Sequence, residues 1–192
     1  MNQPALYTAI AYALWGILGF IWILFTFTNK RTVQKEGSRG RLAVLLVLII
    51  GYVITFSQHI PLPIIGYAFI ITPALGWVGV FVTACGVVLA VWARFVIGRN
   101  WSGSGITLKE NHELVQSGAY RIVRHPIYTG LLLAAIGVVI AEAAPFNFVG
   151  VLLIAVAFLI RIPKEERLMM KQFPTQYPVY ANKVKKLIPF VW

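Results

Sequence analysis

Long apolar runs alternate with short polar segments along this chain of 192 residues. A hydrocarbon core about 30 Å thick requires roughly 20 apolar residues in helical form. Five runs meet or approach this length, so the pattern predicts an all-α integral membrane protein with five transmembrane helices. The spans are expected at about residues 4–27, 42–57, 73–98, 126–144 and 146–162.

One further apolar segment, residues 60–71, carries Pro61, Pro63 and Gly66. Proline inside a helix removes a backbone hydrogen bond, so we expect a loop on the membrane or a re-entrant piece here instead of a span. The prediction is therefore a single membrane domain over residues 1–192. Residues 1–72 hold two spans and an external loop, and residues 73–192 hold three spans, the last two forming a tight antiparallel hairpin.

Charge predicts the orientation of these spans. All 17 lysines and arginines lie in three places: between the first and second spans, between the end of the third and the start of the fourth, and at or beyond the end of the fifth. The positive-inside rule then places the N-terminus outside and the C-terminus in the cytoplasm. The net charge of +11 is explained by this topology together with attraction to anionic membrane lipids. No basic stripe with interleaved aromatic residues indicates a nucleic-acid partner.

The kinds and positions of the polar residues argue against several classes of function. Cys85 is the single cysteine, so a disulfide within the chain is impossible, and it is expected to be a small packing residue. His112 and His125 are too few and too isolated to predict a metal site. Ionisable residues are absent from the predicted span centres, which disfavours a transporter or proton pump.

The chemistry-bearing residues gather at the cytoplasmic ends of spans three to five. The segment GAYRIVRHPIYTG, residues 118–130, leads into span four, and RIPKEER, residues 161–167, closes span five. Arg161 and Glu165 share one helix face if the helix continues past Pro163, which should kink it. The alternative is an ordinary solvated helix end, and Arg94 alone would be expected to extend its guanidinium to the headgroups. Together the clusters predict an active-site pocket at the cytoplasmic face.

An ordered set of motifs in the second half of the chain resembles the isoprenylcysteine carboxyl methyltransferase family, which has relatives among the membrane phospholipid methyltransferases. The set comprises Arg94 with residues 98–102, then His112–Val115, Gly118–Tyr120, Arg124–Gly130, Glu165–Glu166, Phe173, Tyr177, Tyr180 and Leu187–Pro189. Each piece alone is weak, whereas the order and spacing of the set are specific. Spans one and two carry no family signature.

The resemblance implies S-adenosylmethionine as methyl donor, with S-adenosylhomocysteine as product, bound between spans four and five and their flanking loops. Glu165 would hold the amino group of the methionine part, with Glu166 as the other choice, and Arg161 would bind the substrate carboxylate. Arg94 is a weaker candidate for the same anion or for ordering the pocket. The remaining cofactor contacts implied are His112, Glu113, Leu114, Val115 and Tyr120 at the nucleoside end, with His125, Pro126 and Tyr128 at the start of span four.

Three functions follow from these observations. The first is methyl esterification of the carboxylate of an isoprenylated cysteine or another lipid-modified carboxylate, with no protein partner expected beyond the acceptor. The second is phospholipid N-methylation, which requires a base for the amine that the sequence does not identify. The third is a membrane scaffold or transporter without catalysis, for which Glu165→Gln would be tolerated.

Overall fold

The computed structural model describes residues 3–27, 29, 32–35, 40–57, 72–101, 107–109 and 113–192. Over these residues the chain is mainly helical, as predicted. The loop expected at residues 60–71 and the candidate residue His112 lie outside the described residues. The α-helices are α1 (Gln3–Thr26), α2 (Arg41–Thr55), α3 (Pro73–Ile97), α4 (Pro126–Glu142), α5 (Phe148–Gln172) and α6 (Gln176–Lys183). Short 3-10 helices are η2 (Gly98–Asn100), η3 (Gly118–Arg121) and η4 (Pro145–Asn147).

Local sequence explains where the helices begin and end. Thr72 caps α3 by accepting a hydrogen bond from the backbone N–H of Leu75 at 3.3 Å, and Pro73 occupies the first turn. Pro126 likewise occupies the first turn of α4. Ala143, the residue after the end of this helix, has a left-handed backbone conformation with φ 49°. α5 continues through Pro163 as far as Gln172, well beyond the predicted end of the fifth span.

Three helices are long and apolar enough to cross a bilayer, within residues 5–26, 73–100 and 145–172. The other two predicted spans are also apolar helices, α2 of 15 residues and α4 of 17 residues. At 1.5 Å per residue these two measure about 22 and 25 Å, less than the roughly 30 Å of a hydrocarbon core. Three of the five predicted spans therefore satisfy the length criterion in the described part of the chain.

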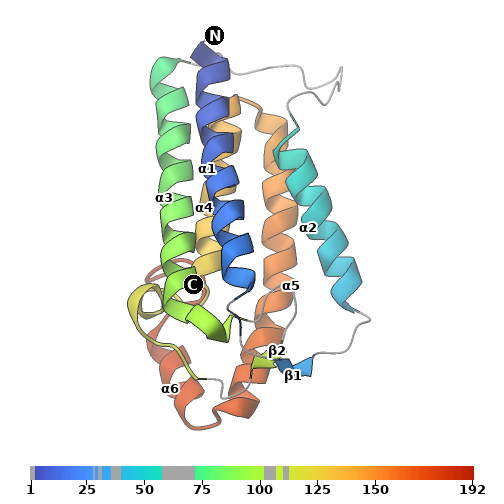
Figure 1. The fold of residues 1–192 in the computed structure, drawn as a ribbon, viewed down its shortest axis with the longest axis vertical. Helices are drawn as coiled ribbons and strands as arrows, with labels where there is room; N and C mark the ends of the chain where they lie inside the picture. Colours follow the sequence, from blue (N-terminus) through green and yellow to red (C-terminus); the bar gives the residue numbers. More distant parts are fainter. Residues whose placement is uncertain are drawn as a thin grey trace.

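The helices run side by side in a bundle, with α3 packed against both α1 and α4, and α2 packed against α5 (Figure 1). Small residues allow the backbones to approach closely. A Cβ on Gly86 of α3 would lie 2.3 Å from the backbone nitrogen of Ala134 in α4, and one on Gly150 of α5 would lie 2.5 Å from the carbonyl oxygen of Gly51 in α2. Glycine is required at such contacts, which are typical of helix packing in membranes.

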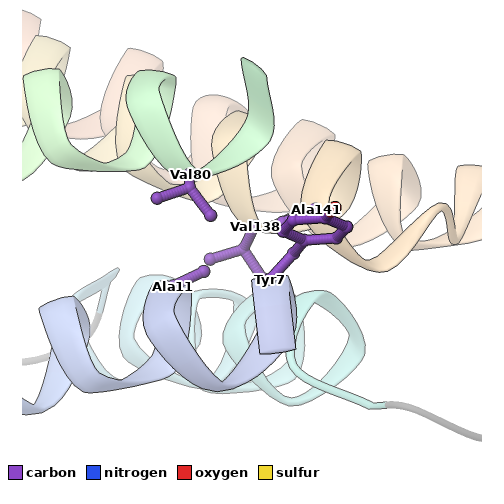
Figure 2. Close-up of a cluster of buried hydrophobic side chains, with 5 residues drawn as sticks. All are labelled: Tyr7, Ala11, Val80, Val138 and Ala141. Atoms are coloured by element: carbon purple, nitrogen blue, oxygen red, sulfur yellow. The ribbon is translucent and has the colours of Figure 1, made fainter. Parts of the chain in front are cut away.

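A buried apolar cluster joins α1, α3 and α4 in the half of the bundle away from the candidate site. Tyr7 and Ala11 of α1 lie against Val80 of α3 and against Val138 and Ala141 of α4 (Figure 2). This packing attaches α1, which lacks the family motifs, to the two helices that carry them.

A polar cluster closes the same end of the bundle. Glu142 at the end of α4 accepts hydrogen bonds from the Tyr12 hydroxyl and, at 2.8 Å, from the Asn147 side chain. Asn147 also donates to the carbonyl oxygen of Ser57 at 3.0 Å. The partly buried carboxylate thus has hydrogen-bond partners from α1 and η4, which offset its removal from water.

The opposite end of the bundle is polar and basic. There α1, α3 and α5 end while α2 and α4 begin, and α6 lies beyond it (Figure 1). A short antiparallel pair, β1 (Thr32–Lys35) with β2 (Thr107–Lys109), lies at this end and was not predicted. It joins the segment after α1 to the segment after η2, so chain regions far apart in sequence frame the same end.

Candidate functional site

A cavity of about 380 Å³ opens at the basic end of the bundle. Its volume lies within the range of about 300–1,000 Å³ typical of small-molecule sites. Of the predicted site residues, those that line it are Glu113, Leu114, Val115, Tyr120, His125, Tyr128, Arg161 and Glu165. These residues extend from Glu113 to Glu165, which are 52 positions apart in the sequence, and the fold brings them around one cavity.

Glu165 is the polar centre of this cavity. Its Oε1 accepts a hydrogen bond from the Tyr128 hydroxyl at 2.5 Å and another from Nη2 of Arg161 at 3.1 Å. Its Oε2 lies 3.7 Å from Nδ1 of His125. The Arg161–Glu165 pair forms because α5 remains helical beyond Pro163, so the predicted sharing of one face is confirmed.

A stack of rings forms the wall beside Glu165. The rings of His125 and Tyr128 lie nearly parallel with centroids 5.6 Å apart, and Tyr128 stacks on Phe158 of α5 at 4.2 Å. Cζ of Arg161 lies 5.9 Å from the Tyr128 ring centroid. The stack orients the Tyr128 hydroxyl toward Glu165 and leaves the charged groups at one edge of a flat aromatic wall.

Glu166 has a different environment from Glu165. It is buried, does not line the cavity, and its Oε1 accepts from Nε of Arg124 at 2.8 Å and lies 3.3 Å from Nε2 of His125. Arg124 also donates through Nη1 to the carbonyl oxygens of Ala181, at 2.7 Å, and Val184. This arginine therefore ties α5 to α6, a role that the sequence analysis did not assign.

The segment after α6 runs beside the start of α4. Val123 forms a parallel bridge with Lys185, and the backbone N–H groups of Arg124 and His125 donate to the carbonyl oxygens of Lys185, at 2.7 Å, and Lys186, at 3.0 Å. These bonds fix the backbone that presents His125 to the cavity.

Tyr177 and Tyr180 of α6 also line the cavity. The Tyr180 hydroxyl donates to the carbonyl oxygen of Tyr120 at 2.6 Å. Burial raises the pKa of Tyr120, Tyr177 and Tyr180 well above the usual range of a phenol. Their hydroxyl groups therefore stay protonated at neutral pH and serve as hydrogen-bond donors.

Arg94 and Pro126, which were predicted site residues, do not line the cavity. Arg94 is fully buried, and its guanidinium donates to the carbonyl oxygens of Gly98 at 2.6 Å and Phe25 at 3.1 Å, and to Oδ1 of Asn29 at 2.8 Å. Cζ of Arg94 lies 4.6 Å from the Trp101 ring, and Trp101 does line the cavity. Pro126 is buried in the first turn of α4. Arg94 thus holds the end of α1 and a cavity wall in place.

The first two helices also contribute to the cavity, which the sequence analysis did not predict. Trp22 comes from α1, and Leu48 and Tyr52 come from α2. Together with Leu131 and Phe158 they make an apolar side that faces the interior of the bundle. The cavity therefore has a charged end around Glu165 and an apolar end between helices.

Comparison with known proteins shows a family resemblance over about half of the chain. Residues 77–171 match the isoprenylcysteine carboxyl methyltransferase family. The matched region runs from α3 into the last turn of α5, so it contains both the Arg124–Tyr128 motif and the Arg161–Glu166 motif.

Three curated relatives carry consistent names. A probable protein-S-isoprenylcysteine O-methyltransferase of Oryza sativa subsp. indica is 32% identical over 119 residues, covering 61% of this chain and 62% of the relative. Protein-S-isoprenylcysteine O-methyltransferase B of Arabidopsis thaliana is 32% identical over 115 residues, 59% of this chain and 58% of the relative. The Saccharomyces cerevisiae protein-S-isoprenylcysteine O-methyltransferase is 35% identical over 101 residues, 52% of this chain and 42% of the relative. The chain therefore matches less than two thirds of the length of each.

Proposed function

We propose that this protein transfers a methyl group from S-adenosylmethionine to the carboxylate of an isoprenylated cysteine, giving a methyl ester. The observation that carries the proposal is the meeting of two family motifs in one cavity. The start of α4 supplies His125 and Tyr128, the end of α5 supplies Arg161 and Glu165, and all four line the same space. A scaffold without catalysis would have no need for a charged cluster around a cavity of this size.

The residues around the cavity fit the proposed cofactor. The Glu165 carboxylate matches the ammonium group of a methionine moiety, and the Tyr128–Phe158 stack offers flat apolar surface beside it. The nucleoside end would lie against residues 113–115 and Tyr120, and the further predicted contact, His112, is outside the described residues. When bound, S-adenosylmethionine supplies an electrophilic methyl group and leaves as S-adenosylhomocysteine.

Glu165 is the better choice of the two adjacent glutamates for this role. It lines the cavity, whereas Glu166 is buried and engaged by Arg124. His125 lies between the two carboxylates and helps to hold their relative positions. Pro126 supports this arrangement as the first residue of α4 and acts through the position of His125.

Arg161 is proposed to bind the acceptor carboxylate. Its guanidinium lines the cavity one helical turn from Glu165, and arginine forms two parallel hydrogen bonds with a carboxylate. The acceptor needs no general base, because a carboxylate is ionised near neutral pH. The protein's contribution is then to orient the carboxylate oxygen and exclude water, which lowers the barrier by several kcal/mol. Arg94 is proposed to act only by positioning Trp101.

The arrangement of His125 favours this reaction over phospholipid N-methylation. An amine acceptor must lose a proton, and among the described residues His125 is the imidazole that lines the cavity. Both of its ring nitrogens face carboxylate oxygens, at 3.7 Å from Glu165 and 3.3 Å from Glu166. Because each nitrogen is directed at a glutamate, the ring is poorly placed to accept a proton from a substrate.

We also propose that the cavity opens at the cytoplasmic face of a five-span membrane protein. Basic residues occupy the cavity end of the bundle, where positive charge is favoured on the cytoplasmic side. In this arrangement α2 and α4 are the short spans and the N-terminus lies outside. The isoprenoid chain of the acceptor would lie against the apolar side of the cavity, near Trp22, Leu48 and Phe158.

Calorimetric titration of the detergent-purified protein with S-adenosylmethionine and S-adenosylhomocysteine tests the cofactor site. Saturable binding is expected for the unaltered protein. It is also expected for the control variant Lys171→Gln, which removes the charge of an exposed residue in the last turn of α5. Binding is expected to be lost in Glu165→Gln. Absence of binding to the unaltered, folded protein would refute the proposal.

Methyl transfer from labelled S-adenosylmethionine tests the acceptor. An S-farnesylated N-acetylcysteine is expected to become base-labile methyl ester, and phosphatidylethanolamine is expected to remain unlabelled. Arg161→Ala is expected to retain cofactor binding and lose turnover. Loss of cofactor binding in Arg161→Ala with acceptor binding intact would reverse the assigned roles of Arg161 and Glu165.

A further inference from the structure

The last residue of α6 and the segment that follows it, residues 183–192, expose apolar side chains. Ile188, Phe190 and Val191 are 54%, 94% and 70% exposed. The backbone N–H groups of Leu187 and Ile188 donate to the carbonyl oxygen of Trp192 at 2.9 and 2.8 Å, which closes a turn. The three exposed side chains are thus held on the outside of a hydrogen-bonded loop, where water would leave them without any favourable contact.

Basic residues accompany these apolar side chains. Lys183 and Lys185 are exposed, and Nζ of Lys186 lies 4.9 Å from the ring centroid of Trp192. No acidic residue occurs after Glu166 in the sequence. A tryptophan with flanking lysines and exposed aliphatic groups is the composition found where proteins meet the headgroup region of a membrane.

The segment also lies at the level where a membrane surface is expected. From α6 the chain returns to the start of α4, where Lys185 and Lys186 accept hydrogen bonds from the backbone of Arg124 and His125. In Figure 1 the C-terminus lies at the height of the lower part of α3, above α6. The segment is therefore level with the change from apolar helices to the basic end of the bundle.

We propose that residues 183–192 form an interfacial anchor for an anionic bilayer surface. Ile188, Phe190 and Val191 enter the region below the headgroups, and Lys183 and Lys185 bind lipid phosphates. Each lysine near an anionic surface is expected to strengthen the contact about fivefold. The inference requires that the bundle spans a membrane but does not depend on methyl transfer.

The anchor is joined directly to the candidate site. The same segment gives the carbonyl oxygens of Lys185 and Lys186 to the backbone of Arg124 and His125, and the carbonyl oxygen of Leu187 accepts from Thr129 Oγ1 at 2.8 Å. Lipid contact therefore restrains the segment that positions His125. The interaction surface and the start of α4 form one connected unit.

Site-directed spin labelling of the full chain in lipid nanodiscs tests the anchor. A nitroxide is placed at Phe190→Cys in a Cys85→Ser background, and its accessibility to oxygen and to a water-soluble nickel complex is compared. In phosphatidylcholine with phosphatidylglycerol the label is expected to favour oxygen, as an immersed position does. The same label at Gln172→Cys, at the exposed end of α5, is expected to favour the nickel complex.

Charge variants separate lipid binding from other causes of burial. The label at residue 190 is expected to lie deeper in phosphatidylcholine discs that contain phosphatidylglycerol than in discs that lack it. The double variant Lys183→Gln with Lys185→Gln is expected to reduce this difference in depth. The double variant Arg167→Gln with Lys171→Gln removes the same charge from the exposed part of α5 and is expected to leave the difference unchanged. A label at residue 190 that favours the nickel complex in both lipids would overturn the proposal. Immobilisation that depends on protein concentration would overturn it in favour of a second copy as the occupant.

Discussion

The adjacent residues Glu165 and Glu166 provide a sharp test of the site. The same substitution should abolish cofactor binding at Glu165 and reduce stability at Glu166. Glu165 lines the cavity and its side chain is 19% exposed, whereas the Glu166 side chain is 9% exposed and pairs with Arg124. We predict that Glu165→Gln abolishes S-adenosylmethionine binding with little change in stability. Glu166→Gln should instead lower the free energy of unfolding.

The magnitude follows from the contacts of Glu166. Its Oε1 lies 2.8 Å from both Nε and Nη2 of Arg124, and hydrogen bonds to charged groups contribute about 1.5–3 kcal/mol each. Breaking a buried ion pair costs about 3–5 kcal/mol when a charge is left uncompensated. Glutamine keeps one carbonyl oxygen, and Arg124 keeps the carbonyl oxygens of Ala181 and Val184. We therefore expect a loss of about 2–3 kcal/mol, within the range for one charged hydrogen bond and no greater than the lower limit for a broken buried ion pair.

Two measurements on the same detergent-purified samples check this prediction. Thermal unfolding followed by intrinsic fluorescence should show a lower Tm for Glu166→Gln, by about 4–12 °C. Glu165→Gln should unfold close to the unaltered protein, because a glutamine oxygen can still accept from Tyr128 and Arg161. Calorimetry below the Tm should show cofactor binding by folded Glu166→Gln and none by Glu165→Gln.

The reasoning would be refuted by the reverse pattern. If Glu165→Gln lowered the Tm while retaining cofactor affinity, Glu165 would be a structural ion-pair partner. If folded Glu166→Gln lost affinity while Glu165→Gln kept it, the ammonium group of the cofactor would be bound by Glu166, and the cavity would have to change shape on binding.

Three further predictions concern packing and positioning. Gly86→Ala should destabilise the protein by about 1–3 kcal/mol, because its Cβ meets the α4 backbone, and Gly19→Ala, with open space around it, should cause no loss in the same unfolding assay. Tyr180→Phe removes the 2.6 Å hydrogen bond to the Tyr120 carbonyl oxygen and should lower the free energy of unfolding by about 1 kcal/mol; an unchanged Tm would contradict this. Arg94→Lys keeps the charge but loses the guanidinium group that bonds to Gly98, Phe25 and Asn29, so the Tm should fall. Calorimetry on the folded variant should show unchanged cofactor affinity. A loss of affinity without a lower Tm would place Arg94 at the ligand.

The helix pattern was largely predictable from the sequence because membrane helices follow uninterrupted apolar runs. Pro73 and Pro126 also identify the first turns of α3 and α4 correctly. The length of α5 beyond the predicted span was not predicted, because its continuation to Gln172 does not extend the apolar run. Proline in this case left a continuous helix, and that continuity brings Glu165 above Arg161.

The surroundings of individual polar residues were not predictable in the same way. Arg94 is enclosed by Phe25 and Asn29, which precede it by 69 and 65 positions, so its burial depends on tertiary packing. The contribution of Trp22 and Tyr52 to the cavity has the same origin, since neither belongs to a recognisable motif. The glycines of α3 and α4 carried a usable signal, because small residues recur at helical spacing on both helices and indicate a close pair.

The separate environments of the two glutamates follow from helix geometry. Successive residues on an α-helix point about 100° apart, so Glu165 and Glu166 meet different neighbours. Glu165 lines the cavity, whereas Glu166 is buried against Arg124, which also bonds to the carbonyl oxygen of Ala181 in α6. His125 is within reach of both, and its backbone is fixed by Lys186. A pair of adjacent acidic residues near the end of an apolar helix can therefore divide two tasks, with Glu165 available to a ligand in the proposed site and Glu166 attaching α5 to α6 through Arg124.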